Sequence, residues 1–257
     1  MTAHQRLIRD QRAAEQSDED GLFGDYWAAA DLDIGRAVVR PIDARTAATV
    51  IDRYEWMGRM PAIVVACFGI YFDGLLGGAT VFAPEYAENL GVWDKYGYTG
   101  KIILLARGAC VHWAHPHAAS KLTALAIRQL PRKYEIVTAT VDALAGEVGT
   151  IYQACNFVYA GRMRADNPSS SGSWPTREGY MIDGVLYTGR TMRHRFGTQD
   201  FATISAAHPG SERVEQEAKG RYFTFRGPSA VRRRHLAAIQ HLIQPYPKRP
   251  LDTPTLA

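Results

Sequence analysis

The segment from Arg107 to Lys121 brings together residue types that could bind an anion. An apolar strand containing Arg107 leads into a turn, and a helical pattern begins at Ala118. The first amide groups of a helix have no partner within the helix and carry the positive end of its dipole. Small side chains at this position allow an anion to approach the backbone. Ser120 could bind such a ligand or only cap the helix, and Arg107 could serve the site or lie on an exposed strand face.

Three histidines precede this helix and could instead form part of a metal site. His112, His115 and His117 lie within six residues, and three imidazoles can bind iron or zinc. Their spacing matches no standard metal signature, and the segment is predicted to be a loop. The alternative is that these histidines are solvated or lie beside a ligand, where His117 could contact a phosphate.

A tyrosine further along the chain is the second candidate for chemistry. The segment "GTIYQACNF", residues 149–157, predicts a short helix that runs into a strand, and it sets Tyr152 among apolar residues. Tyr152 could be a core aromatic whose hydroxyl reaches the rim of the core, or it could be an active-site residue. The residue pattern leaves both alternatives open.

The strands that would position these residues predict an α+β fold. Apolar, β-rich runs flank Asp73-Gly74 and predict a hairpin, because a type I′ turn needs positive φ at both central positions. A second hairpin is predicted around Asp183-Gly184. Further strands are predicted at residues 101–111, 134–142 and 157–163. This order of elements predicts one mostly antiparallel sheet with a parallel crossover in the middle.

Helices are predicted between these strands. Asp43 is expected to cap a helix with Ile51 and Tyr54 on one face. The helix that begins at Ala118 is expected to end at Pro131, because proline cannot continue a helix. The last predicted helix lies in "PSAVRRRHLAAIQHLI", which carries three consecutive arginines.

The composition favours a protein without disulfides or membrane spans. Apolar residues make up 46% of the 257 residues, which is enough for a core. The three cysteines, Cys67, Cys110 and Cys155, are few, widely spaced and odd in number, which indicates a reducing compartment. No apolar run approaches the roughly 18 residues that a membrane span needs, and the N-terminus has no apolar signal core. We therefore expect a soluble protein that has no membrane partner and is cytoplasmic.

The C-terminal third of the chain carries most of the positive charge. Residues 160–257 hold 15 Lys and Arg against 8 Asp and Glu, a net charge of +7, whereas the whole chain has a net charge of +4. Such a segment suits a polyanion, although many basic segments are only solvated surfaces. The charge alone leaves nucleic-acid binding open.

Two stretches resemble the core of the GNAT acyltransferase superfamily, "ARGACVHWAHPHAASKL" and "VTATVDALAGEVGTIYQACNFVYAGR". The resemblance implies a GNAT-like α+β fold, with a central, mostly antiparallel mixed sheet flanked by helices. It also implies acyl-CoA, such as acetyl-CoA, as the cofactor. The pyrophosphate would lie at five residues of the turn, His117, Ala118, Ala119, Ser120 and Lys121. Tyr152, five residues before Phe157, would protonate the departing thiolate, because a phenol in a dry site is a suitable proton donor. The turn lacks the glycines usual in that superfamily.

A narrower resemblance, over residues 54–249, is to the Mom family of phage DNA-modification proteins. It rests on motifs that occur in order: "RYEWMGRMP", "LARG", "GTIYQACNFVYAGR", "YMIDGVLYTGRTMRHR", "KGRYFTF" and "PYPKR". The resemblance implies carbamoylmethylation of adenine N6 in double-stranded DNA, which protects phage DNA from restriction enzymes in the cytoplasm of the bacterial host. The catalytic positions carried over are Arg107, Ser120 and Tyr152, with Tyr54 and Asp142 as lesser candidates. Glu147 stands where a histidine is expected in that family.

This reaction places further demands on the protein. A base-paired adenine must leave the stack before an enzyme can reach its N6 atom. Four aromatic residues in predicted loops could hold the base or could only anchor loops on the core, Trp56, Tyr96, Tyr98 and Trp174. Basic residues expected at DNA phosphates are Arg193, Arg195, Arg232, Arg233, Arg234, Lys248 and Arg249. Because carbamoylmethyl is joined through a CH₂ carbon and not through a carbonyl, iron is kept as a second candidate cofactor, with no assigned ligands.

Two other functions remain open on the sequence. One is an ordinary acyl-CoA-dependent N-acyltransferase acting on a small amine or a protein, and the other is a non-catalytic DNA-binding protein on a GNAT fold. The basic C-terminal segment favours the DNA modifier over the first, and Tyr152 with Ser120 favours it over the second. We divide the chain into a polar arm or short helix over residues 1–36, a GNAT-like catalytic core over 37–165, and a basic extension over 166–257. The extension is expected to complete the domain and to contact DNA.

Overall fold

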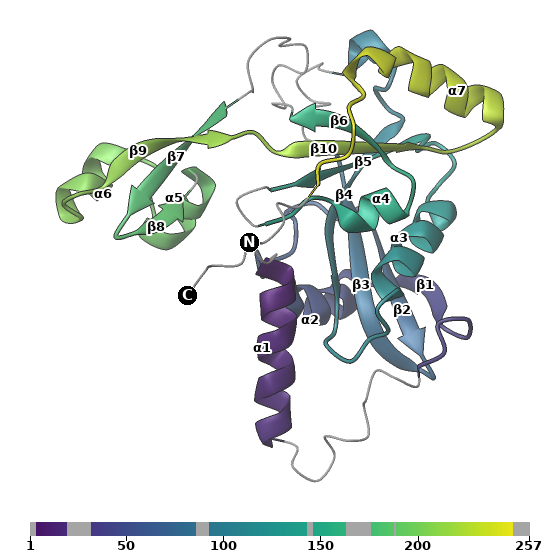
Figure 1. The fold of residues 1–257 in the computed structure, drawn as a ribbon, viewed down its shortest axis with the longest axis horizontal. Helices are drawn as coiled ribbons and strands as arrows, with labels where there is room; N and C mark the ends of the chain where they lie inside the picture. The colour runs from purple at the N-terminus through teal and green to yellow at the C-terminus, as the bar shows by residue number, and fades with distance from the viewer. Residues whose placement is uncertain are drawn as a thin grey trace, which may run out of the picture. The chain divides into compact units, whose positions relative to one another are not determined.

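The computed structural model describes residues 4–19, 32–85, 93–142, 146–162, 176–187 and 189–248. The chain forms two compact units, one made of Met1–Gly161 with Gly220–Ala257 and the other of Arg162–Lys219 (Figure 1). The predicted C-terminal extension is therefore distributed over both units. No helix in the described parts of the chain is both long enough and apolar enough to cross a membrane.

A seven-stranded sheet forms the centre of the first unit, in the order β1-β2-β3-β4-β5-β10-β6 (Figure 1). Its strands are β1 (Val38–Ile42), β2 (Ala66–Phe72), β3 (Leu75–Ala83), β4 (Ile102–Cys110), β5 (Ile136–Val141), β6 (Val158–Arg162) and β10 (Gly220–Phe225). The pairs β1–β2, β2–β3, β3–β4 and β5–β10 are antiparallel, and β4–β5 is parallel. The predicted α+β fold with one parallel crossover in a mostly antiparallel sheet is confirmed.

Helices pack against this sheet. They are α1 (His4–Glu19), α2 (Ala44–Tyr54), α3 (Ala118–Gln129), α4 (Thr150–Ala154) and α7 (Ser229–Ala238), with the short 3-10 helices η4 (Asp94–Tyr96) and η6 (Gln240–Leu242). The Asp43 carboxylate caps α2 by accepting a hydrogen bond from the Thr46 amide at 2.8 Å, as predicted. Helix α3 begins at Ala118 and stops before Pro131, also as predicted. Helix α2 contacts β2, β3 and β4, and α3 contacts β1 to β4.

Both predicted Asp-Gly hairpins are confirmed. Asp73 and Gly74 join β2 to β3 with φ values of 45° and 90°. Asp183 and Gly184 join two strands of the second unit with φ values of 50° and 75°. Positive φ at both central positions is the backbone geometry that gives a two-residue turn the twist of its strands.

The second unit is built on a three-stranded antiparallel sheet in the order β8-β7-β9. Its elements are β7 (Thr176–Ile182), β8 (Val185–Tyr187), α5 (Gly189–Phe196), α6 (Phe201–Ala207) and β9 (Glu212–Glu217). Ile182, Met192 and Ile204 form its small buried core. The chain then returns to the first unit, where β10 lies between β5 and β6.

The geometry of β4 creates the space for a site. Strand β4 pairs with β5 only from Ile102 to Leu105, whereas its pairing with β3 continues to Cys110. Val81 lies opposite Arg107 and Phe82 lies opposite Leu105, so Ala106 is an extra residue in the ladder. An extra residue of this kind bends a strand and increases its twist. The second half of β4 therefore departs from β5.

Candidate active site

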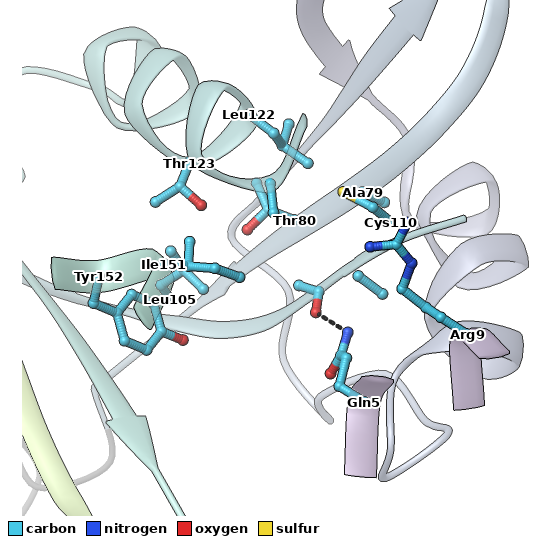
Figure 2. Close-up of a pocket in the computed structure, with 13 residues that line it drawn as sticks. Gln5, Arg9, Ala79, Thr80, Leu105, Cys110, Leu122, Thr123, Ile151 and Tyr152 are labelled. Carbon is cyan, nitrogen blue, oxygen red and sulfur yellow. Dashed lines mark hydrogen bonds between the residues drawn. The ribbon is translucent and has the colours of Figure 1, made fainter. Parts of the chain in front are cut away.

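A cavity of about 100 Å³ lies beside this part of β4 (Figure 2). Its walls come from β3, β4, α3, α4 and α1, and most of them are apolar. Gly108 and Cys110 line it from β4, Ala119 and Thr123 from α3, and Tyr152 from α4. Two segments that the sequence suggested for chemistry, the start of α3 and the tyrosine of "GTIYQACNF", therefore meet in one cavity.

Packing holds the Tyr152 ring at the wall of this cavity. The ring centroid lies 5.3 Å from that of Phe157 and 5.4 Å from that of Tyr222. Figure 2 shows the Tyr152 hydroxyl directed toward the side of the cavity where Gln5 lies. Burial raises the pKa of the Tyr152 phenol, and the nearby carboxylate of Glu147 raises it further. The phenol therefore stays protonated at neutral pH and can donate a proton.

The backbone before α4 sets the position of Tyr152. Gly149 has a φ of 72°, a conformation that suits glycine and strains other residues. The Tyr222 hydroxyl donates a hydrogen bond to the Val148 carbonyl at 2.6 Å, and the side-chain amide of Gln153 donates to the same carbonyl at 2.7 Å. A glycine turn and two side chains thus orient a helix of only five residues.

The start of α3 offers unpaired amides next to the cavity. The Ala118 amide donates to the His115 carbonyl at 2.8 Å, and the Lys121 amide donates to the His117 carbonyl at 3.1 Å. Between them, the amides of Ala119 and Ser120 donate to no carbonyl in the described chain. Such amides, at the positive end of a helix dipole, can hold an anionic group.

Two side chains predicted to serve this turn make other contacts. The Ser120 hydroxyl donates to the His117 carbonyl at 3.0 Å, one turn back, and Ser120 does not line the cavity. The Lys121 ammonium donates to the Ile34 carbonyl, and to the Gly35 carbonyl at 3.2 Å. The ammonium therefore ties α3 to the segment before β1. Of the five residues of this turn, only Ala119 lines the cavity in the described chain.

Arg107 lies outside the cavity and supports the backbone. Its Nε donates to the Arg59 carbonyl at 3.0 Å and its Nη1 donates to the Ala106 carbonyl at 2.6 Å. The Glu55 carboxylate lies 3.8 Å from the Arg107 Nε. These contacts hold the strand at its extra residue, which is a positioning role.

Tyr54 and Asp142 also lie outside the cavity lining. The Tyr54 hydroxyl lies 3.1 Å from the His112 Nδ1, and the two rings are stacked. Asp142 is buried at the end of β5, where its amide donates to the Glu147 carboxylate at 3.1 Å. Both residues support elements around the site without lining it.

The three histidines do not gather around one point for a metal. His112 contacts Tyr54, while the His115 Nδ1 accepts a hydrogen bond from the His117 amide at 3.0 Å. Among the described residues, no group of three or more His, Cys, Asp or Glu side chains is arranged to hold a metal ion. The candidate cofactor iron therefore has no residues assigned to it.

Four polar residues of the cavity were not predicted from the sequence, Gln5, Arg9, Thr80 and Thr123. Gln5 and Arg9 come from α1, a stretch that the sequence indicated only as a polar arm or short helix. Their spacing of four residues places them on one face of a helix and was the available signal. Burial raises the pKa of the Cys110 thiol to about 12, so this cavity residue is almost entirely a neutral thiol at neutral pH and reacts only slowly, through its small thiolate fraction.

The basic residues predicted to contact DNA are exposed where the structure describes them. Arg232, Arg233 and Arg234 are exposed on α7, and Lys248 is exposed after η6. Arg193 and Arg195 are exposed on α5 of the second unit. Arg249 lies outside the described residues.

The aromatic candidates for holding a base differ among themselves. Tyr98 is fully buried, and its hydroxyl donates to the His235 carbonyl at 2.6 Å. Tyr98 therefore anchors its loop under α7, which is the second of the two roles considered for these aromatic residues. Tyr96 packs beside it with ring centroids 5.8 Å apart, and Trp56 is partly buried after α2. Trp174 lies outside the described residues.

The fold is α+β, and the start of a helix and a tyrosine line one cavity at the point where two parallel strands separate. Residues 36–248 match the Mom protein family, and the chain belongs to this family. A comparison with curated proteins finds no match.

Three of the solved structures similar to the chain are acetyltransferases. A GNAT family acetyltransferase from Elizabethkingia anophelis with acetyl-CoA bound has 10% identity and a TM-score of 0.40, covering 74% of this chain and 98% of that one. An N-acetyltransferase from Staphylococcus aureus Mu50 has 15% identity and a TM-score of 0.41, with the same coverage of 74% and 98%. A Bacillus subtilis acetyltransferase in complex with CoA has 10% identity and a TM-score of 0.39, covering 75% and 99%. At TM-scores this low, the function has to be argued from the site itself.

Proposed function

We propose that this chain is a transferase that carbamoylmethylates adenine N6 in double-stranded DNA and so protects phage DNA from restriction in the cytoplasm of a bacterial host. One observation carries the proposal: Tyr152 and Ala119, at the start of α3, line the same cavity. Membership of the Mom family supports it, because the matched residues 36–248 include both Tyr152 and the start of α3. The substrate class comes from the resemblance to phage DNA-modification proteins.

The start of α3 is suited to the phosphates of an acyl-CoA donor. The Ala119 and Ser120 amides are unpaired in the described chain, and the small side chains there allow close approach. When bound, acyl-CoA would supply a carbonyl carbon activated by its bond to sulfur, whereas carbamoylmethyl transfer needs a CoA derivative whose sulfur is bonded to the CH₂ carbon. The residues of α3 would hold and orient the donor, while the apolar walls of the cavity exclude water from the reacting atoms.

Tyr152 would supply the proton that the reaction needs. The adenine N6 amine attacks the donor carbon, the bond from that carbon to the leaving group breaks, and the amine nitrogen loses a proton. The departing anion takes a proton from the Tyr152 hydroxyl, whose raised pKa keeps it protonated between turnovers, and the proton that the amine loses returns to the phenolate through solvent. Because carbamoylmethyl is attached through CH₂, the donor must carry its leaving group on that carbon. Attack on a thioester carbonyl would give an amide instead.

The exposed arginines of α7 provide a surface for the DNA backbone. Arg232, Arg233 and Arg234 point in different directions around the helix because successive residues are about 100° apart. This arrangement is unsuited to a buried helix, and it suits contacts with phosphates. Among the described residues, the one carboxylate that pairs with these arginines is Glu135, whose oxygen lies 3.7 Å from the Arg234 guanidinium.

Nucleoside mass spectrometry of plasmid DNA tests the proposal. DNA from cells that express the chain is digested and compared with DNA from cells that express Tyr152→Phe. We expect a modified deoxyadenosine, heavier by one carbamoylmethyl group in place of one hydrogen, only with the unchanged chain. Unmodified deoxyadenosine in DNA from cells with abundant folded protein would refute DNA modification.

The second candidate function is an ordinary acyl-CoA-dependent N-acyltransferase. The size of the cavity favours it, because about 100 Å³ is enough for a small acyl group and too small for a nucleobase together with a donor. Purified protein incubated with acetyl-CoA and small amines, without DNA, would release free CoA under this alternative. Carbamoylmethylated deoxyadenosine in DNA from expressing cells, with no release of CoA from acetyl-CoA by the purified protein and small amines, would favour the first candidate.

A further inference from the structure

Helix α1 contributes to the cavity although it lies outside the part of the chain that matches the family. The family match covers residues 36–248, whereas α1 spans His4–Glu19. Gln5 and Arg9 of α1 nevertheless line the cavity (Figure 2). A site built only from the family-matched part would lack this wall.

Side-chain hydrogen bonds to backbone carbonyls hold α1 in this place. The Gln5 Nε2 donates to the Gly108 carbonyl of β4 at 2.9 Å. The Arg9 Nη2 donates to the His112 carbonyl at 3.0 Å and contacts the Ala114 carbonyl at 3.4 Å. The carbonyls that accept hydrogen bonds from Gln5 and Arg9 therefore all lie in the stretch from β4 to the start of α3.

Arg9 is the one charged side chain among the residues that line the cavity. Its two recorded contacts use one guanidinium nitrogen, Nη2, so the N–H groups of Nε and Nη1 are available to a ligand. The positive charge reaches neighbouring groups: it lowers the pKa of His112, second to the effect of burial. Around it, the other walls are neutral and mostly apolar, which strengthens the interaction of a guanidinium with an anion.

We propose that Arg9 makes this cavity select a ligand group that carries a carboxylate. A planar guanidinium matches a carboxylate with two parallel hydrogen bonds, and such a pair offsets the charge of an arginine in an apolar cavity. The inference rests on the proposed function only in taking the cavity as the place where the donor binds. It adds that the part of the donor inside the cavity is acidic.

Cys110 provides a built-in reporter for this selection, because it lines the same cavity as Arg9. Thiosulfonate reagents react with its thiolate, form a mixed disulfide and release methanesulfinate. The full-length protein is treated with an anionic reagent, carrying a sulfonatoethyl group, or with a cationic one of similar size, carrying a trimethylammonioethyl group. Peptide mass mapping separates the reaction of Cys110 from that of Cys67 and Cys155.

We expect Arg9→Gln to lower the ratio of anionic to cationic labelling rates at Cys110 by at least about fivefold, since one full positive charge is removed from a poorly solvated site. Arg9→Lys, which keeps the charge, should retain most of the ratio. Arg6→Gln is the matched control, because the Arg6 side chain is 69% exposed on the same helix. If Arg9→Gln changes both rates equally, Arg9 only holds α1 in place and the inference is wrong. Failure of Cys110 to react with either reagent before the protein unfolds would also overturn it, because a ligand cavity must admit small molecules.

Protection by acetate tests the carboxylate itself. Acetate should slow labelling of Cys110 by the neutral reagent methyl methanethiosulfonate in the unchanged protein, and acetamide, which is nearly the same shape, should not. Arg9→Gln should abolish the difference, and equal protection by acetate and acetamide would count against carboxylate selection. Neither measurement uses DNA or a donor. An unmodified adenine with a shifted labelling ratio would therefore refute the proposed function and leave the Arg9 inference standing.

Discussion

Replacing Tyr152 with phenylalanine removes one oxygen from the cavity and leaves the ring. The ring contacts with Phe157 and Tyr222, at 5.3 and 5.4 Å between centroids, persist in the variant because they involve no hydroxyl. The free energy of unfolding should therefore change by less than about 1 kcal/mol, the size of one ordinary hydrogen bond or less. The proton donor, in contrast, is lost completely.

The expected loss of activity follows from that role. General acid catalysis by one positioned group contributes about 10²- to 10⁴-fold, so the rate of adenine modification should fall by this factor. DNA affinity should not change, because the exposed arginines of α7 are untouched. The rate is measured as the fraction of modified deoxyadenosine against time, and affinity is measured by fluorescence anisotropy.

Tyr246→Phe is the matched control for this variant. The Tyr246 hydroxyl donates to the Phe157 carbonyl at 2.6 Å, and Tyr246 does not line the cavity. This control also loses one tyrosine hydroxyl, from a side chain that contacts the backbone of Phe157, and it should keep its activity. A Tyr152→Phe variant that modifies DNA at the full rate would remove Tyr152 from the chemistry and would refute the reasoning.

Four other outcomes are expected. Arg233→Glu should weaken DNA binding and reduce the slope of log affinity against log salt by about 0.9 for each lost phosphate contact, and an unchanged slope would exclude α7 from the interface. Gly149→Ala should destabilise the fold by about 2–4 kcal/mol in urea unfolding, because its φ is 72° and an added Cβ would lie 2.5 Å from the Tyr222 ring; near-zero loss would contradict that close approach. Glu85→Ala should cost about 3–5 kcal/mol, because it leaves the buried Arg221, 3.0 Å away, without its carboxylate; a smaller loss would mean that water reaches Arg221. Burial raises the pKa of Tyr222 to about 12, above its unfolded value of about 10, so the contribution of Tyr222 to the free energy of unfolding should be constant below about pH 10 and fall by up to about 3 kcal/mol toward pH 12; the difference in free energy of unfolding between the unchanged protein and Tyr222→Phe should follow this curve, and a difference independent of pH would contradict it.

Local signals in the sequence predicted the elements around the site well. The start of α3 at Ala118 and the Asp73-Gly74 turn follow from the backbone preferences of a few adjacent residues. The short helix that carries Tyr152 was likewise readable from nine residues. Each of these features depends on interactions within one turn, which a local pattern records.

Contacts between distant segments could not be read in this way. Strand β10 pairs with β5 across a separation that includes the whole second unit, from Ile136↔Phe225 to Val141↔Gly220. Its apolar pattern is that of any half-buried strand, and nothing local indicates its partner. The place of α1 beside β4 depends on two side chains, Gln5 and Arg9, whose carbonyl partners carry no sequence signal.

Arg107 shows what an arginine in an apolar strand can do besides binding a ligand. An arginine in an apolar strand must find partners when it is buried, and a ligand is only one kind of partner. Here the partners are two backbone carbonyls, Arg59 and Ala106, and the Glu55 carboxylate at 3.8 Å. Ala106 is the extra residue of β4. The guanidinium therefore donates a hydrogen bond to the carbonyl of the residue at which the strand bends away from β5. The separation of the strands leaves room for the cavity, which Tyr152 and Ala119 at the start of α3 line. These contacts let Arg107 act on the site through the shape of β4, and a direct part in the chemistry stays a prediction.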